Sequence, residues 1–87
     1  MITSASNKSI KNVQALLSKA KERKKQGVFV VEGPKMSFEA PYDWVSAVYM
    51  SESFFNDDRF KEEKKRFIDK TEIVSDSVFK SMSDTQT

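Results

Sequence analysis

A run of four β-branched or aromatic residues, 28–31, lies between the only two glycines of this 87-residue chain, Gly27 and Gly33. Four consecutive apolar residues without alternation predict a strand that is buried on both faces. Phe29 lies in this run, so its replacement by alanine is expected to cost about 3–5 kcal/mol. Gly27 permits a sharp turn, and Pro34 is favoured at the first position of a helix. The sequence thus predicts a helix, a central strand and a second helix, joined by tight turns.

A longer helix is predicted before this run. Ser6 or Asn7 is suited to cap its first turn, because a short polar side chain accepts hydrogen bonds from the free N–H groups there. The apolar residues that follow recur at helical spacing and predict one buried stripe over about four turns. They are Ile10, Val13, Leu16, Leu17 and Ala20.

Shorter elements alternate through the rest of the chain. The patterns predict helices at 34–40, after Ser51, after Asn56 and after Ser75, and strands at 47–50 and 71–74. Alternating helices and strands indicate a layered α/β domain. Within it, Met36 and Ala40 are expected to point inward. The last helix is expected to bury Val78, Phe79 and Met82.

Two further segments have simple structural interpretations. The rings of Tyr42 and Trp44 are expected to lie over the edge of the core. In the helix after Asn56, Phe60, Phe67 and Ile68 are expected to share one buried face. The mixed-sign run Lys61–Arg66 is then predicted to be a solvated surface with weak ion pairs and no function.

The residue types that are missing limit the chemistry. The chain contains no cysteine and no histidine, which excludes thiolate metal sites, the commonest general base and the commonest transition-metal ligand. No serine, lysine or carboxylate pair lies in a recognised catalytic motif, so no catalytic residue and no metal ligand is predicted. Neither a signal peptide nor a membrane span is apparent, and a cytoplasmic location is expected.

Positive charge is concentrated in the first third of the chain. Residues 1–35 contain eight Lys or Arg and two acidic residues, whereas residues 36–87 contain seven and eleven, and the net charge is only +2. A basic face of this kind favours a polyanionic partner. A solvated helix end, where cations favour the helix dipole, explains the charge of residues 19–25 equally well.

Several short motifs occur in an order that resembles the N-terminal substrate-binding domain of the SpoU/TrmH family of RNA 2′-O-ribose methyltransferases. The resemblance covers essentially the whole chain. Its motifs are Ile2-Thr3-Ser4, Asn7, Ile10-Lys11, Lys21-x-Arg23, Gly27-x-Phe29-x-x-Glu32-Gly33, Val78-Phe79 and Met82-Ser83-Asp84-Thr85.

The resemblance implies a three-layer α/β/α sandwich with a small mixed sheet, similar to ribosomal proteins that bind kinked RNA. Residues 1–82 would be the RNA-binding domain, and 83–87 the start of a linker to an absent catalytic domain. That catalytic domain would bind S-adenosylmethionine and form a homodimer. This chain would hold no cofactor and have no enzyme activity of its own.

The resemblance also implies which residues face RNA, with rRNA favoured over tRNA. The RNA-facing residues would be Asn7, Lys8, Lys11, Arg23, Lys24, Lys25 and Lys35. Glu32 and Gly33 would be structural, with Glu32 paired to Arg23 or to backbone N–H groups. The alternative is a protein–protein interaction module, in which the Phe54-Phe55 region docks on the catalytic domain or on a ribosomal protein.

Overall fold

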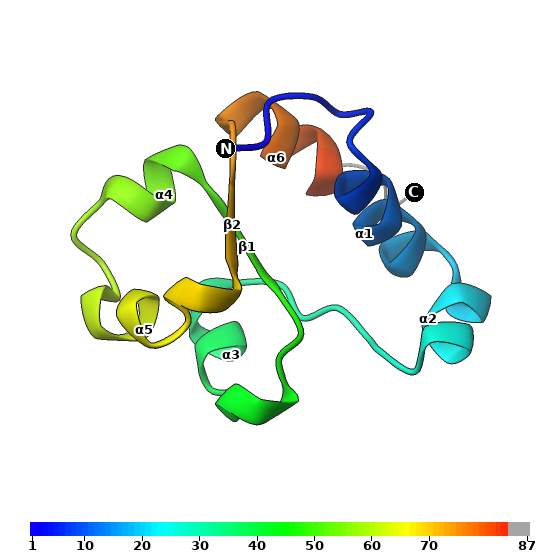
Figure 1. Ribbon diagram of the computed structural model, residues 1–87, viewed down its shortest axis with the longest axis horizontal. Coiled ribbons are helices and arrows are strands. Elements are labelled where there is room, and N and C mark those ends of the chain that lie inside the picture. The colour runs from blue at the N-terminus through cyan, green and yellow to red at the C-terminus, as the bar shows by residue number, and fades with distance from the viewer. Residues whose placement is uncertain (84–87) are drawn as a thin grey trace.

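The computed structural model describes residues 1–83, with the side chain of Ser83 left undescribed. Figure 1 shows how its elements are arranged. The helices are α1 (Lys8–Ser18), α2 (Ala20–Gln26), α3 (Pro34–Phe38), α4 (Glu52–Asn56), α5 (Lys61–Arg66) and α6 (Asp76–Ser83). The strands are β1 (Val48–Ser51) and β2 (Thr71–Val74), and the 3₁₀ turns are η1 (Tyr42–Trp44) and η2 (Ile68–Lys70).

The two strands confirm the α/β class and two of the three predicted strands. They pair in parallel, with Val48 opposite Thr71 and Ser51 opposite Val74. On the other edge of β2, Ile2 donates to the carbonyl of Ile73 at 2.8 Å and accepts from the N–H of Ser75 at 2.8 Å. The sheet of the described residues is therefore narrow and parallel, and the expected mixed sheet is not formed.

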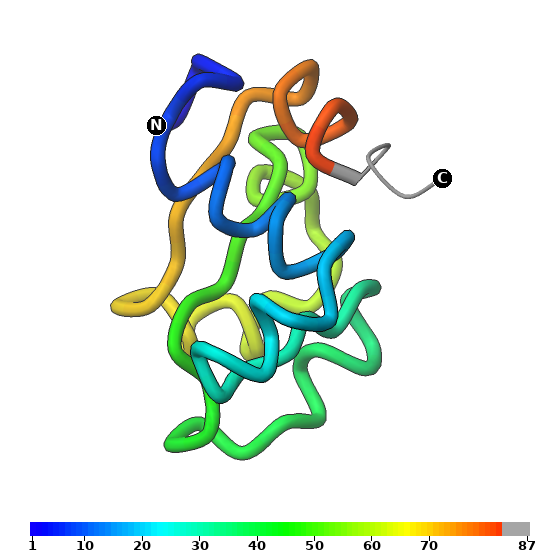
Figure 2. Tube along the Cα trace, turned by 90° about the vertical axis from the view of Figure 1, so that its right-hand side faces the viewer, coloured from blue at the N-terminus to red at the C-terminus, as the bar shows by residue number. Residues whose placement is uncertain are grey.

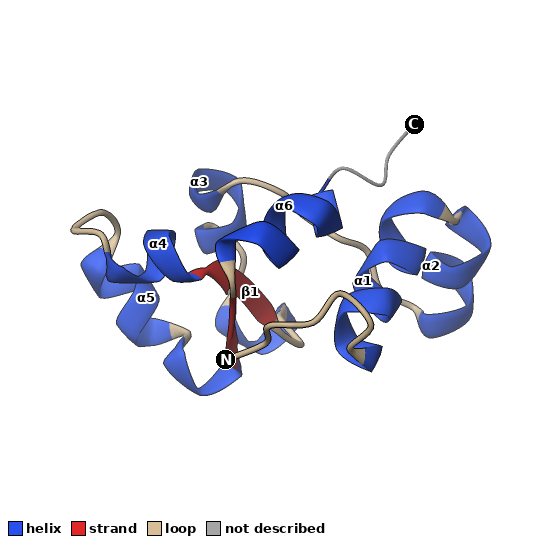
Figure 3. Ribbon diagram, turned by 90° about the horizontal axis from the view of Figure 1, so that it is seen from above, coloured by secondary structure: helices blue, strands red, loops and turns tan. Residues whose placement is uncertain are grey.

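Each face of this sheet supports its own apolar cluster. The first joins α1, β2 and α6 through Ile10, Val13, Val74, Val78 and Met82. The second joins α3, β1 and the end of α5 through Phe38, Met50 and Phe67. Because side chains alternate across a strand, Tyr49 packs on the first cluster while its neighbours Val48 and Met50 pack on the second. Figure 3 shows the helices on the two sides of the strands, as the three-layer prediction requires.

Helix α1 forms where its apolar stripe and its cap predict it. The side chain of Asn7 accepts from the N–H groups of Ser9 at 2.8 Å and Ile10 at 3.4 Å. Ile10, Val13 and Leu16 are buried, and Leu17 packs against the same cluster. The predicted last member of the stripe, Ala20, is exposed and begins α2, because the chain is extended at Lys19. The predicted last helix is confirmed in the same way, since Val78 and Met82 are buried and Phe79 packs against them.

The predicted central strand is wrong. Residues 28–31 form no strand, and Phe29 is 75% exposed. Gly27 and Gly33, at the ends of this segment, have φ angles of 71° and 94°. The chain turns sharply at both places, and the segment between them runs as a loop from α2 to α3. A β-favouring composition is not sufficient, because a strand is stabilised by its cross-strand neighbours.

Three predictions about large side chains near α3 and α5 are also wrong. Met36 is 65% exposed, and Phe38 is the residue that α3 buries. Trp44 is 81% exposed, whereas Tyr42 stacks on Phe67 with ring centroids 5.8 Å apart. Ile68 is 53% exposed because the chain leaves α5 at Phe67 and turns into η2.

The run Lys61–Arg66 is not simply a solvated surface. Lys64 is buried, and its amine donates to the carbonyl of Phe54 at 2.5 Å and to the carboxylate of Asp57 at 2.9 Å. Arg66 donates to the carbonyl of Phe38 at 2.5 Å. Phe60 has a positive φ of 55°, which turns the chain so that α5 packs back on α4. These two cations hold the second layer together.

Candidate nucleic-acid interface

The basic N-terminal segment folds into two helices, α1 and α2, that pack on each other. Lys19 separates them, because its backbone is extended, with φ −127° and ψ 108°. Gly27 ends α2 in the left-handed conformation that glycine favours at this position. Figure 2 views the molecule from the side on which α1 and α2 lie in front of the strands.

Arg23 connects α2 to the end of α1. Its guanidinium donates to the carbonyl of Leu16 at 2.6 Å and to that of Leu17 at 3.3 Å. The last carbonyls of a helix have no partner within the helix, so a cation that binds them satisfies them and also favours the helix dipole. The contacts that the structure gives to Arg23 are structural ones within this helix pair.

A second connection lies further from the junction between the two helices. The side-chain amides of Asn12 in α1 and Gln26 in α2 exchange two hydrogen bonds, at 2.9 and 3.3 Å. Gln26 also donates to the carboxylate of Glu22 at 3.2 Å. Helix α2 is therefore held against α1 at two points, and the exposed lysines of both helices belong to one packed helix pair.

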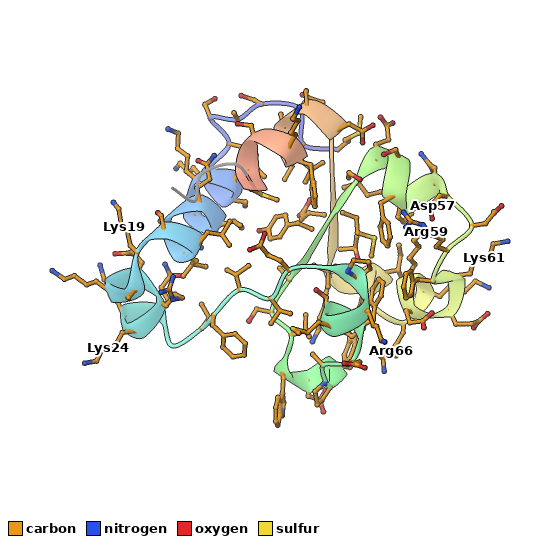
Figure 4. The ribbon with its side chains drawn as sticks, turned by 180° about the vertical axis from the view of Figure 1, so that it is seen from behind. Lys19, Lys24, Asp57, Arg59, Lys61 and Arg66 are labelled. Carbon is orange, nitrogen blue, oxygen red and sulfur yellow. The ribbon has the colours of Figure 1, made fainter. Side chains whose placement is uncertain are left out.

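This surface, which we call the α1–α2 basic surface, contains the exposed lysines of the two helices and the residue between them. Figure 4 shows Lys19 and Lys24 pointing outward from this end of the molecule. Glu22 is the only acidic residue within 8–26. The exposed lysines are Lys8, Lys11, Lys19, Lys21, Lys24 and Lys25.

The structure divides the residues that the sequence predicted to face RNA into three groups. Lys8, Lys11, Lys24 and Lys25 are exposed on the α1–α2 basic surface. Asn7 and Arg23 are partly buried and used for capping. Lys35 is exposed but lies on α3, at the far end of segment 27–33 from α2.

The residues predicted to be structural lie in that same segment. Gly33 precedes α3 with a φ of 94°, a value that favours glycine. Glu32 is exposed beside it. The predicted ion pair between Glu32 and Arg23 stays a prediction. The residues predicted to face RNA did not include Lys19 and Lys21, although both belong to the basic run 19–25.

A second charged group lies on the opposite side of the molecule, around Asp57. Its carboxylate accepts from the guanidinium of Arg59 at 2.8 and 3.0 Å and from the amine of Lys64 at 2.9 Å. The hydrogen bond from Arg59, followed by that from Lys64, holds the pKa of Asp57 well below its usual range. Because Arg59 and Lys64 are paired here, this side has less free positive charge than the α1–α2 basic surface.

Beside Asp57 lies an open groove of about 400 Å³. Its lining includes the apolar residues Phe55 and Ile68 and the exposed lysines Lys61 and Lys65. The Phe54 ring is packed among Phe38 and Phe60, with Lys64 4.3 Å from its centre. Of the pair Phe54-Phe55, Phe55 lines this groove and Phe54 does not.

Two classes of site are not formed by residues 1–83. No three or more carboxylates in this range gather where a metal ion would bind. No helix in the same range is both long and apolar enough to cross a bilayer. The α1–α2 basic surface is thus the strongest candidate site in the described part of the chain.

Comparison with known protein families gives a match. The family model described as MRM3-like substrate binding domain matches residues 7–87. No curated protein and no solved structure matches the chain. The matched range includes both helices of the α1–α2 basic surface and both strands.

Proposed function

Since this chain belongs to the MRM3-like substrate-binding domain family, a substrate-binding domain of SpoU-type RNA methyltransferases, we propose that it binds RNA through the α1–α2 basic surface. One observation carries the proposal. Five exposed lysines on two packed helices, together with Lys19 between the helices, are accompanied by one acidic residue, Glu22. That carboxylate accepts a hydrogen bond from Gln26. Phosphate contacts from lysine supply most of the sequence-independent affinity for nucleic acid.

The helix pair is suited to this role because it is preorganised. Arg23 and the Asn12–Gln26 amide pair fix α2 against α1 before any ligand arrives. Lysines on a fixed surface lose less freedom on binding than lysines on a flexible tail. Lys8 and Lys11 lie on one helix and Lys24 and Lys25 on the other, so the phosphate contacts come from both helices.

We extend the proposal to the enzyme of which such a domain is a part. A separate catalytic domain would bind S-adenosylmethionine, form the homodimer and methylate a ribose 2′-hydroxyl, with rRNA as the favoured substrate. This chain would bind the RNA substrate and orient it for the reaction. Calorimetry of the chain with S-adenosylmethionine is expected to show no binding, and a saturable heat signal would contradict this division of roles.

Mapping the bound surface tests the proposal directly. The ¹⁵N-labelled chain is titrated with an rRNA hairpin that carries an unpaired loop. Amide signals of α1 and α2 are expected to shift, while those of α4 and α5 stay in place. Shifts centred on Phe55 and Ile68 would move the RNA site to the groove and contradict the proposal.

The protein-interaction alternative would use the groove that Phe55 lines, because the Phe54 ring is packed against Phe60. Such an apolar contact would depend weakly on salt, unlike phosphate binding. No shift at all with RNA, together with shifts at the groove on addition of the catalytic domain, would favour this alternative.

A further inference from the structure

Phe29 is a large apolar side chain in an unusual place. It is 75% exposed and belongs to neither apolar cluster of the described residues. No other ring or cation of residues 1–83 contacts its ring. Single exposed apolar residues are common on proteins, so the surroundings of the ring decide whether it has a role.

Those surroundings are basic. Phe29 follows the last turn of α2, which carries Lys24 and Lys25, and precedes Lys35 in the first turn of α3. Over residues 24–35 there are three lysines, all exposed, and one acidic residue, Glu32. Figure 4 shows Lys24 pointing outward from the helix end at which this segment starts. The ring therefore lies on the segment that connects the lysines at the end of α2 to Lys35 in α3.

The backbone on both sides of Phe29 is turned in a fixed way. Gly27 adopts the left-handed conformation at the end of α2, and its N–H donates to the carbonyl of Arg23 at 2.9 Å. At the other end, the hydroxyl of Ser37 donates to the carbonyl of Val31 at 3.3 Å. The segment that presents the ring is thus anchored to α2 at one end and to α3 at the other.

Trp44 provides an internal comparison, because it is similarly exposed but differently surrounded. It is 81% exposed, and residues 39–45 contain two acidic residues and no lysine or arginine. Lys70 lies nearby, but its amine is bound to the carbonyls of Tyr42 and Val45, each at 2.8 Å. An RNA strand that follows positive charge reaches Phe29 and not Trp44.

We propose that the ring of Phe29 is a stacking platform for an unpaired RNA base, beside backbone phosphates held by Lys24, Lys25 and Lys35. The inference rests on the proposed RNA-binding function and narrows its ligand to RNA with unpaired nucleotides. Aromatic side chains next to lysines bind single strands in this way, because every base has a π-face. Bases inside a duplex are stacked on each other and unavailable to such a ring.

The test compares Phe29→Leu, Phe29→Trp and Trp44→Leu with the unaltered chain. Each is titrated with a labelled short oligouridylate and with a blunt RNA duplex. Phe29→Leu is expected to lose about fivefold or more in affinity for oligouridylate, with its salt dependence unchanged, and nothing for the duplex. Phe29→Trp is expected to retain single-strand affinity, because it keeps an aromatic face. Trp44→Leu is expected to bind both RNAs as the unaltered chain does.

Three results would overturn the inference. Unchanged oligouridylate affinity of Phe29→Leu would remove the stacking contact. An equal loss of oligouridylate affinity in Trp44→Leu would show that any exposed aromatic ring contributes to the affinity, whatever its position. A melting temperature of Phe29→Leu many degrees below that of the unaltered chain would place the ring in the interior. Failure of the unaltered chain to bind either RNA would instead contradict the proposed function itself.

Discussion

Asn12 and Gln26 are fourteen residues apart in the chain, and their side-chain amides pair reciprocally across the two basic helices. Both side chains are exposed, so the pair contributes little to the core. Its effect is geometric, since it joins the α2 end that carries Lys24 and Lys25 to the α1 face that carries Lys8 and Lys11. The basic surface depends on this contact for its shape.

Removing the amide pair is expected to loosen α2 without unfolding the domain. Asn12→Ala should lower the free energy of unfolding by about 0.5–1 kcal/mol, because the hydrogen bonds are exposed. Hydrogen exchange should become faster for the α2 amides, while the strand amides keep their protection. Asn56→Ala, an exposed asparagine on α4, is the matched control and should leave α2 unchanged. Equal protection of α2 in both variants would contradict the role of the pair.

Lys64 is expected to be the most important cation for stability. Its replacement by methionine keeps the apolar stem but leaves the carbonyls of Phe54 and Asp57 without the donor. Losing the donor to these partly buried acceptors should cost about 1–3 kcal/mol in chemical unfolding. Lys65→Met, at the exposed neighbour, should stay within about 0.5 kcal/mol. Similar costs for both variants would show that Lys64 is solvated in solution.

The lowered pKa of Asp57 predicts a pH dependence of stability. A carboxylate whose folded pKa lies below its unfolded value stabilises the fold above the unfolded pKa, here about 3.8, and loses that contribution as pH falls through the folded pKa. The difference in unfolding free energy between the unaltered chain and Asp57→Asn should be constant from about pH 7 to pH 5. It should shrink as the pH is lowered below about 4. A difference that does not change with pH would exclude this linkage.

The elements that the sequence predicted correctly are those whose stabilising partners are local or periodic. The α1 stripe and the Asn7 cap need only residues within a few positions of each other. Residues 48–51 and 71–74 have compact apolar patterns, and each is followed by a helix whose start a serine predicts. The hydroxyl of Ser51 accepts from the N–H of Phe54 at 3.2 Å and so caps α4, whereas the buried hydroxyl of Ser75 has no hydrogen-bond partner in the described residues.

The central strand could not be excluded from the sequence, because its composition is that of a buried strand. Whether such a run forms a strand depends on a neighbour with free hydrogen-bonding groups and on side chains that cover both faces. Here β2 has β1 on one side and Ile2 on the other, and residues 28–31 do not pair with the remaining edge of β1. Residues 28–31 are left as a connection, and the glycines at either end only show that the chain turns.

The structural roles of Lys64 and Arg23 could not be predicted from the sequence, for a related reason. Both cations bind backbone carbonyls, which every residue carries and no residue type reveals. Lys64 belongs to a run that looks like a solvated face, and its burial follows from the turn at Phe60. For the candidate site, the sequence predicted four of the exposed lysines of α1 and α2 and the Asn7 cap, whereas the structural use of Arg23 needed the fold.

The salt dependence of RNA binding tests the α1–α2 basic surface most directly. The double variant Lys24→Gln with Lys25→Gln is compared with Lys61→Gln with Lys65→Gln, an equal charge change at exposed lysines of α5. Arg23 and Lys64 are left intact because they hold the fold. Each lost phosphate contact should reduce the slope of log affinity against log salt by about 0.7–0.9, so the α2 variant should lose about 1.4–1.8. The α5 variant should keep the original slope, and an equal loss in both variants would contradict RNA binding at the α1–α2 basic surface.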